Sequence, residues 1–256
     1  MTDTGPEPAP DVSYHAYDEG QLKKGGAHPG PADPVALLVH SQFRAMMLSE
    51  AYTCIGGASA VRRGTYRFGV FPELATPAAV EQSRAALGEF LHEFPEEENA
   101  VAVFVASFEG PVIDSEASFE QLLWQQLQGL HDLDTQPVWW DPTGLEEWND
   151  ELGFVFGGRN FFVVGLHPAA SRWSRRFGWP TLVFNALSHV RPLERADQFA
   201  RMQSKIRARD HRLQGSNNPS LDQSQVAQFS GRDVEADWEF PLRPRGHETG
   251  CPRSRP

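Results

Sequence analysis

The chain has 256 residues, of which 40% are hydrophobic, and it carries a formal net charge of -11. This length and hydrophobic content predict one folded domain with a substantial core. The acidic charge argues against a general nucleic-acid-binding protein, because phosphate contacts need a basic surface. Neither cysteine, Cys54 or Cys251, lies in a CxxC pair, so the sequence predicts neither a disulfide scaffold nor a cysteine zinc site.

The two ends of the chain are poor in apolar residues. Residues 1–32 are rich in Gly, Pro and Asp, and residues 243–256 have a similar composition, so both are predicted to be disordered tails. The folded body is expected over residues 33–242. The beginning of the chain lacks a signal-peptide pattern, and no apolar run approaches the ~20 residues that span a bilayer. We therefore expect a soluble, cytoplasmic protein that has no membrane partner.

The first half of the body alternates predicted helices and strands. Asp33 followed by Pro34 is a typical helix start, and Thr76 followed by Pro77 repeats it. Between these two helices, residues 65–71 alternate in the manner of a strand. Residues 100–108 are predicted to form a buried strand.

The second half continues in the same way. A helix is predicted to begin after Ser115, and residues 152–168 indicate a hairpin or bulged strand that turns at Gly157–Gly158. A strand over residues 180–187 and a helix starting with Pro192 complete the body. The fold predicted from this order is α+β: a single domain with a mixed or mainly antiparallel sheet and flanking helices. The chain lacks the GxxxxGK[ST], GxGxxG, HExxH and GxSxG motifs.

An apolar run that ends in a histidine is the main candidate site. Strand alternation places His167 on the same face as Phe161, Val163 and Gly165, and Pro168 ends the strand. The missing side chain at Gly165 is expected to leave room for a large flat group beside the imidazole. The alternative is a core histidine bonded to a backbone carbonyl.

Three arginines follow the histidine. At their spacing, Arg172, Arg175 and Arg176 are able to share one helical face. Clustered guanidinium groups beside an apolar pocket suit a ligand with carboxylates or phosphates. A solvated charged loop is the alternative interpretation.

Several blocks in order, not one motif, carry a family resemblance. The segments "FFVVGLHPAASRWSRRFGWPTLVFN", "KIRARDHRLQGSNNP" and "FSGRDVEADW" together resemble the YqcI/YcgG family, and "FEQLLWQQLQGLHDLD" and "YTCIGGASAVRRGTYRFGVF" fit it as well. The resemblance extends from Tyr52 to Trp238. Members of this family include haem-dependent N-oxygenases of bacterial natural-product pathways, which hydroxylate guanidine or amine nitrogens, as in arginine N-hydroxylation for cycloserine and in the pre-guanitoxin step.

The resemblance implies a haem-dependent monooxygenase that binds haem b non-covalently. It would use dioxygen, an external electron donor such as a separate reductase, and a small amine or guanidine substrate. His167 would be the axial iron ligand, Gly165 would clear space for the ring, and Arg172, Arg175 and Arg176 would pair with the propionates.

Two other residues compete for the iron. His131 is the rival histidine, with Asp132 and Asp134 close by to orient it. Its alternative role is that of a helix C-terminal histidine stabilised by the helix dipole. Where relatives have a Trp-x-Cys-Pro-Phe-like segment, this chain has "WEFPL", with Phe240 in place of the cysteine. Cys54, in a glycine-rich stretch expected to be flexible, is then the one internal thiol, and a small buried side chain is its alternative role.

Substrate contacts are expected from the block "RARDHRLQGSNNP", which begins with Arg207. Asp210 is able to clamp a cationic guanidinium or ammonium group, with Arg209 beside it and with Asn217 and Asn218 in a polar loop around the substrate. Alternatively, the arginines there form the solvated end of a helix. Trp173, Phe177 and Trp179 line the pocket or belong to the core.

Two other functions use the same residues. A haem-binding sensor or carrier needs the same axial ligand and propionate partners. A metal-free domain would use the arginines to bind a small anionic molecule.

Overall fold

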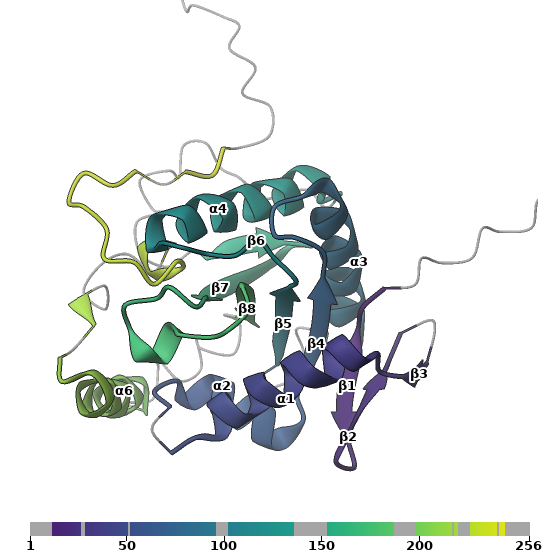
Figure 1. Cartoon of the computed structure of the whole chain (residues 1–256), viewed down its shortest axis with the longest axis horizontal. Coiled ribbons are helices and arrows are strands. Elements are labelled where there is room, and N and C mark those ends of the chain that lie inside the picture. The colour runs from purple at the N-terminus through teal and green to yellow at the C-terminus, as the bar shows by residue number, and fades with distance from the viewer. Residues whose placement is uncertain are drawn as a thin grey trace, which may run out of the picture.

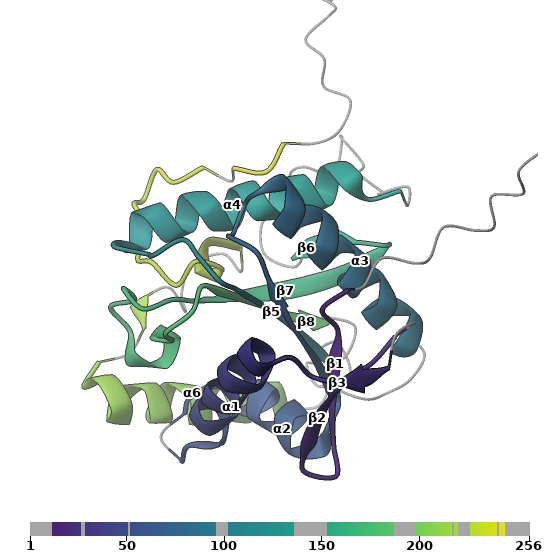
Figure 2. The same ribbon diagram turned by 45° about the vertical axis from the view of Figure 1, so that its right-hand side comes forward.

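The structure is a computed structural model, and it describes residues 12–26, 29–50, 52–95, 102–135, 153–186, 198–216, 218–219, 226–239 and 241–243. Figures 1 and 2 show one body in which helices lie on both faces of a sheet. The strands are β1 (His15–Asp18), β2 (Gln21–Lys24), β3 (Gly30–Pro31), β4 (Tyr66–Phe71), β5 (Val103–Phe108), β6 (Phe154–Phe156), β7 (Arg159–Leu166) and β8 (Thr181–Ala186). The helices are α1 (Pro34–Leu48), α2 (Ile55–Arg63), α3 (Pro77–Glu93), α4 (Glu116–Leu133) and α6 (Gln198–Gln214), with short 3₁₀ turns η2 (Trp173–Arg175) and η5 (Val226–Gln228).

The described strands form one mixed sheet in the order β3-β2-β1-β4-β5-β8-β7-β6. Strands β4 and β5 are parallel and are connected through α3, whereas the other neighbouring pairs are antiparallel. Helices α3 and α4 pack on one face, and α1 and α2 pack on the other (Figure 1). The single α+β domain with a mixed sheet and flanking helices is therefore confirmed.

Local capping explains where three of these helices begin. Asp33 accepts a hydrogen bond from the Ala36 amide at 2.8 Å, and Thr76 and Ser115 cap α3 and α4 in the same way. In α1 and α3 a proline follows the cap, where its missing N–H costs nothing and its fixed φ favours the helix. These three predicted helix starts are confirmed.

The predicted hairpin is also confirmed. Strands β6 and β7 pair with Phe154 opposite Phe161, and they turn at Gly157 and Gly158. Both glycines have positive φ, 58° and 74°, which is the backbone that a tight two-residue hairpin turn requires. The Asp134 carboxylate accepts the Gly157 amide at 2.8 Å and fixes this turn to the end of α4.

The predicted disorder of residues 1–32 is wrong for much of that segment, which contributes β1, β2 and β3. Strand β1 pairs with β4, placing His15 opposite Phe68. The Tyr14 side chain is buried, and its hydroxyl donates to Glu93 at 2.6 Å. These are tertiary contacts that the composition of the segment does not reveal. Residues 1–11 and 244–256 lie outside the described residues.

The stretch around Cys54 is a helix start, so the expectation of a flexible segment is wrong there. Cys54 Sγ accepts the Gly57 amide at 3.3 Å and caps α2, which ends at Gly64 with φ 72°. The expectation failed because Gly56 and Gly57 lower helix propensity, whereas packing of α2 against α1 compensates for it.

Within the described residues, no helix combines the length and the apolar character that crossing a membrane requires.

Candidate functional site

His167 follows directly after β7 and is completely buried. Phe161 and Val163, on the same face of β7, belong to the core beneath α4, as strand alternation predicts. The Phe119 ring of α4 stacks on the imidazole with 4.2 Å between ring centroids and 22° between planes. Backbone bonds hold the residue on both sides, because its amide donates to the Arg175 carbonyl at 3.0 Å and its carbonyl accepts from the Phe177 amide at 3.2 Å.

The His167 side chain has no hydrogen-bond partner among the described residues. Both Nδ1 and Nε2 are buried and unbonded, so the alternative of a core histidine bonded to a backbone carbonyl does not describe this ring. A buried polar atom without a partner is uncommon and costs about 1–3 kcal/mol. Such an atom calls for a physical explanation, and a ligand on the nitrogen is one.

The imidazole is neutral near pH 7. Burial, assisted by the nearby charge of Arg175, lowers the pKa of His167 from 6.5 to about 4, and Glu116 opposes that shift. A neutral ring keeps a nitrogen lone pair, which is the form that coordinates a metal.

The space beside Gly165 is filled, so the expected room for a flat group is not found there. A Cβ at this position would lie 2.5 Å from Phe119 Cε1 and 2.9 Å from the Phe229 carbonyl oxygen. The Gly165 amide donates to that same carbonyl at 2.8 Å. The glycine therefore permits close packing of Phe119 and of the segment after η5 against β7.

The three arginines do not share a helical face. They lie around the 3₁₀ turn η2, with Arg172 before it, Arg175 within it and Arg176 after it. Each guanidinium group has its own partners, so the predicted joint face for propionates is not formed.

Arg175 binds backbone carbonyls. Its guanidinium donates to the Gly165, Phe229 and Gln228 carbonyls at 3.1, 3.2 and 3.0 Å. Burial lowers its pKa, while Tyr52, Cys54 and Asp210 raise it. Arg175 thus joins the end of β7 to η5 with its side chain and holds the His167 amide with its own carbonyl.

Arg172 and Asp210 form a buried ion pair. Arg172 also donates to the hydroxyl and the carbonyl of Ser216, at 2.9 and 2.8 Å. The Asp210 carboxylate, predicted to receive a cationic substrate, therefore faces a cation of its own chain. This pair fastens α6 to the loop after β7.

The other residues predicted for the pocket are divided between surface and core. Arg176 is exposed, with its guanidinium 4.2 Å from the centre of the exposed Trp173 ring and with Nε bonded to the Ala170 carbonyl. Phe177 is buried against Phe43, and Trp179 donates to Gln42 at 2.9 Å.

The remaining predicted substrate residues lie at or near α6. Arg209 donates to the Tyr52 carbonyl at 3.4 Å, and Asn218 is half-buried. Asn217, like Phe240, lies outside the described residues.

The rival ligands occupy other positions. His131 is buried in the last turn of α4, as expected for a helix C-terminal histidine, and Asp134 bonds to the Gly157 amide of the hairpin. Cys54 is half-buried at the start of α2. Across the described ranges, no group of three or more His, Cys, Asp or Glu side chains is placed to hold a metal ion.

Sequence reasoning missed Glu116, the carboxylate whose charge acts on His167. Its Oε1 accepts both the amide and the hydroxyl of Ser171 at 2.8 Å, which ties the first turn of α4 to the loop after β7. The sequence did not reveal this electrostatic interaction, because 51 residues separate Glu116 from His167.

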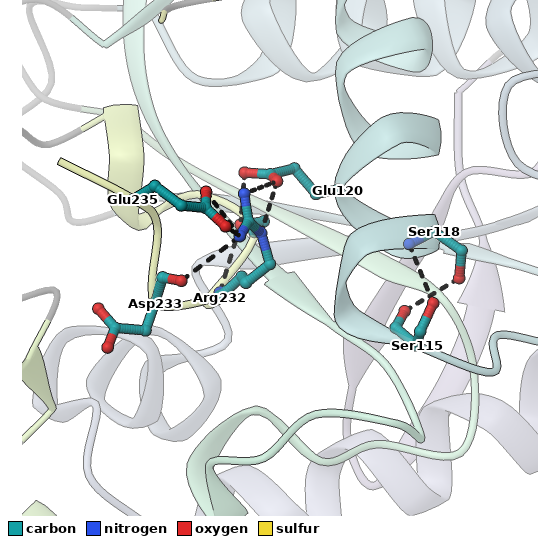
Figure 3. A network of polar contacts seen from close by, with 7 residues as sticks. Ser115, Ser118, Glu120, Arg232, Asp233 and Glu235 are labelled. Carbon is teal, nitrogen blue, oxygen red and sulfur yellow. Dashed lines mark hydrogen bonds and ion pairs between the residues drawn. The ribbon is translucent and has the colours of Figure 1, made fainter. Parts of the chain in front are cut away.

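A second carboxylate of α4 secures the segment after η5. Glu120 binds Arg232 at 2.6 Å and accepts the Ser230 hydroxyl at 3.3 Å, and Arg232 also binds Glu235 (Figure 3). This network holds the segment whose Phe229 carbonyl bonds to Gly165. Through that bond it supports the end of β7 next to His167.

These contacts define an α+β protein with a neutral histidine enclosed between α4, β7 and the turn η2, whose ring nitrogens have no hydrogen-bond partner among the described residues. The YqcI/YcgG family model matches residues 43–243, and the chain belongs to that family. No curated protein and no solved structure matches the chain.

Proposed function

We propose that this protein is a haem-dependent N-oxygenase acting on a small amine or guanidine, with His167 as the axial ligand of the iron. The observation that carries the proposal is the buried, neutral imidazole whose two nitrogens have no partner among the described residues. The family resemblance supplies the reaction class. Haem would supply the activation of dioxygen, and a separate electron donor would supply the electrons.

The imidazole fits an axial ligand in its chemistry, whereas the packing of Phe119 and of the Phe229 carbonyl beside Gly165 does not fit the porphyrin ring. Haem needs few ligands from the protein, because the porphyrin occupies four positions of the iron. Phe119 covers one face of the imidazole, so it restricts the ring's rotation while leaving the nitrogens at the ring edge unbonded. Arg175 restrains the backbone of the same residue.

The residues do not fit the propionate partners that the resemblance implied. Arg172 is neutralised by Asp210, and Arg175 is bonded to three carbonyls. Arg176 is exposed and has a single bonded carbonyl, so it is the one of the three that we retain as a propionate partner.

Glu116 is a better candidate than Asp210 to bind the cationic group of the substrate. Binding to Asp210 would require breaking its buried pair with Arg172, which leaves a buried charge unpaired. Glu116 is half-buried and acts electrostatically on His167, and its bonds to Ser171 use only Oε1. We therefore assign Oε2 of Glu116 as an acceptor for a guanidinium or ammonium group.

Spectroscopy tests the cofactor. The chain, supplied with haem b, is expected to show a Soret band, and His167→Gly is expected to lose or shift it. Added imidazole should restore the band in His167→Gly by replacing the missing ring. His211→Gly, at an exposed position of α6, is the control and should bind haem normally. An unchanged spectrum in His167→Gly would reject His167 as the ligand.

Turnover tests the reaction. Loaded protein, oxygen and a reductant are supplied with arginine and with simple amines, and products are measured for the mass of one added oxygen on nitrogen. Haem binding without substrate-dependent oxygen consumption would favour a sensor or carrier instead. Absence of a Soret band would favour a metal-free binding domain.

A further inference from the structure

A groove lies at the other end of the sheet, far from His167. It has a volume of about 1060 Å³ and is bounded by the hairpin β2–β3 and by α1. Five strand positions separate β2 from β7, which is about 24 Å at about 4.8 Å per strand. Nothing in the proposed N-oxygenase function uses this groove.

The groove combines cationic and apolar walls. Lys23, Lys24 and Arg44 line it, and no aspartate or glutamate is among its described lining residues, although Lys23 pairs with Asp18 and Glu19, which do not line it. This is unusual in a chain whose formal net charge is -11. Leu37 lines the same groove and is 43% exposed, and its neighbour Leu38 is 52% exposed.

Arg44 is the residue that indicates a binding site for an anion. It is half-buried, and its guanidinium lies 4.0 Å from the centre of the Tyr17 ring and donates to the Val61 carbonyl at 3.3 Å. No carboxylate pairs with it in the described part of the chain, in contrast to Arg172, Arg67 and Arg232. Its charge is strong enough there to help lower the pKa of His40.

The aromatic packing around Arg44 preorganises it. The Tyr17 ring contacts both the Arg44 guanidinium and the ring of the buried His40, with 5.1 Å between the centroids of the Tyr17 and His40 rings. His40 Nε2 is 2.6 Å from the Tyr66 hydroxyl, so this stack is anchored to β4. A guanidinium held over an aromatic ring loses little freedom when it binds a carboxylate.

We propose that this groove binds a small organic carboxylate with an apolar body. Arg44 would bind the carboxylate through its planar pair of N–H groups, and Lys24 would add positive charge. Tyr17, Leu37 and Leu48 would contact the apolar part. Because the groove lies at the β3 end of the sheet, this site is independent of the haem site and does not rest on it.

Decanoate is a suitable probe, with three matched controls. Decanol has the chain without the charge, acetate has the charge without the chain, and decyltrimethylammonium has the opposite charge. Calorimetry below the micellar concentration is expected to give saturable binding of one decanoate per chain. The three controls should each bind at least about tenfold more weakly. Equal binding of decanol or of the cation would overturn the proposal.

The lysines locate the binding site. The chain contains Lys23, Lys24 and Lys205, and Lys205 lies exposed on α6, outside the groove. With an amine-reactive ester and mass spectrometry, decanoate should slow the labelling of Lys23 and Lys24 and leave that of Lys205 unchanged. Equal protection of all three, or of none, would overturn the location. Protection that depends on protein concentration without decanoate would assign the groove to a second copy of the chain.

Substitutions test the role of Arg44. Arg44→Gln is expected to weaken decanoate binding at least about tenfold. Arg44→Lys keeps the charge but loses the planar pair of N–H groups, so it should weaken binding less. Leu37→Ser, at an exposed position, tests the apolar wall if Arg44→Gln folds poorly. Lys205→Gln is the control. Unchanged decanoate affinity in both Arg44→Gln and Leu37→Ser would overturn the proposal.

Discussion

Two buried histidines, one on each face of the sheet, have the same charge state but different surroundings. His40 and His167 are 2% and 0% exposed, and burial lowers the pKa of each to about 4. His40 Nε2 lies 2.6 Å from the Tyr66 hydroxyl, whereas neither nitrogen of His167 has a described partner. Burial is the main reason why both rings are neutral, with nearby arginines adding to it, and the hydrogen bond to Tyr66 is what distinguishes His40 from His167.

The largest expected effect comes from the ion pair beside His167. Arg172→Ala should lower the free energy of unfolding by about 3–5 kcal/mol, because it leaves the buried Asp210 carboxylate unpaired. Chemical denaturation measures the change. Lys23→Ala removes two exposed pairs, with Asp18 and Glu19, and should change stability by no more than about 1 kcal/mol. Equal losses in the two variants would contradict the assignment of a buried pair.

The pH dependence of stability tests both histidines. Their folded pKa values, about 4, lie below the ordinary value of 6.5, so the unfolded chain binds more protons between these pH values. Stability should therefore fall as the pH falls from 6.5 toward 4, by up to about 3 kcal/mol for each ring. Denaturation at several pH values measures the slope. His40→Phe and His167→Phe should each reduce it, and a slope unchanged in both would contradict the shifts.

Gly165→Ala tests the close packing beside His167. The added Cβ meets Phe119 and the Phe229 carbonyl, so we expect a loss of about 1–3 kcal/mol in unfolding free energy. Gly88→Ala is the matched control, because its Cβ meets nothing within 4 Å in helix α3. That change should stabilise the protein by about 0.5–1 kcal/mol. A neutral Gly165→Ala would show that the space is open to a ligand.

The smallest expected change in stability is the one that best separates His167 from His40. Without haem, His167→Phe should leave the free energy of unfolding unchanged or raise it, because it loses no hydrogen bond and removes two buried nitrogens that have no partner among the described residues. His40→Phe should cost about 0.5–1.5 kcal/mol, since the buried Tyr66 hydroxyl loses its bond to His40 and keeps the one to the Arg44 side chain. With haem present, only His167→Phe should alter the Soret band. A large loss in apo His167→Phe would indicate a partner for the imidazole.

Local patterns predicted the elements well. Asp33, Thr76 and Ser115 begin helices because a short polar side chain bonds to an amide within its own first turn. The Gly157–Gly158 turn needs two residues with positive φ, and adjacent glycines supply them. Helix α2 and the strands β1, β2 and β3 were not predicted, because their stability comes from packing against distant segments.

The candidate site was predicted only in part. The position of His167 at the mouth of a buried strand follows from alternation and from Pro168, and both are local features. The partners of Arg172, Arg175 and Asp210 do not follow from spacing, since Asp210 is 38 residues from Arg172 and Phe229 is 54 residues from Arg175. The spacing of the charged residues predicted a ligand-binding surface, whereas in the structure Arg172, Arg175 and Asp210 bond to other groups of the protein.

Patterns between neighbouring residues were enough to predict the fold class, most of the elements between residues 33 and 214, and a buried histidine at the end of β7, because period and capping depend on neighbours along the chain. Tertiary packing was needed to show that Phe119 fills the space beside Gly165, that Asp210 neutralises Arg172, and that Arg44 lacks a carboxylate partner among the described residues. These outcomes depend on which side chains meet across the sheet. These contacts are set by packing between segments far apart in the chain, so no local sequence pattern predicts them.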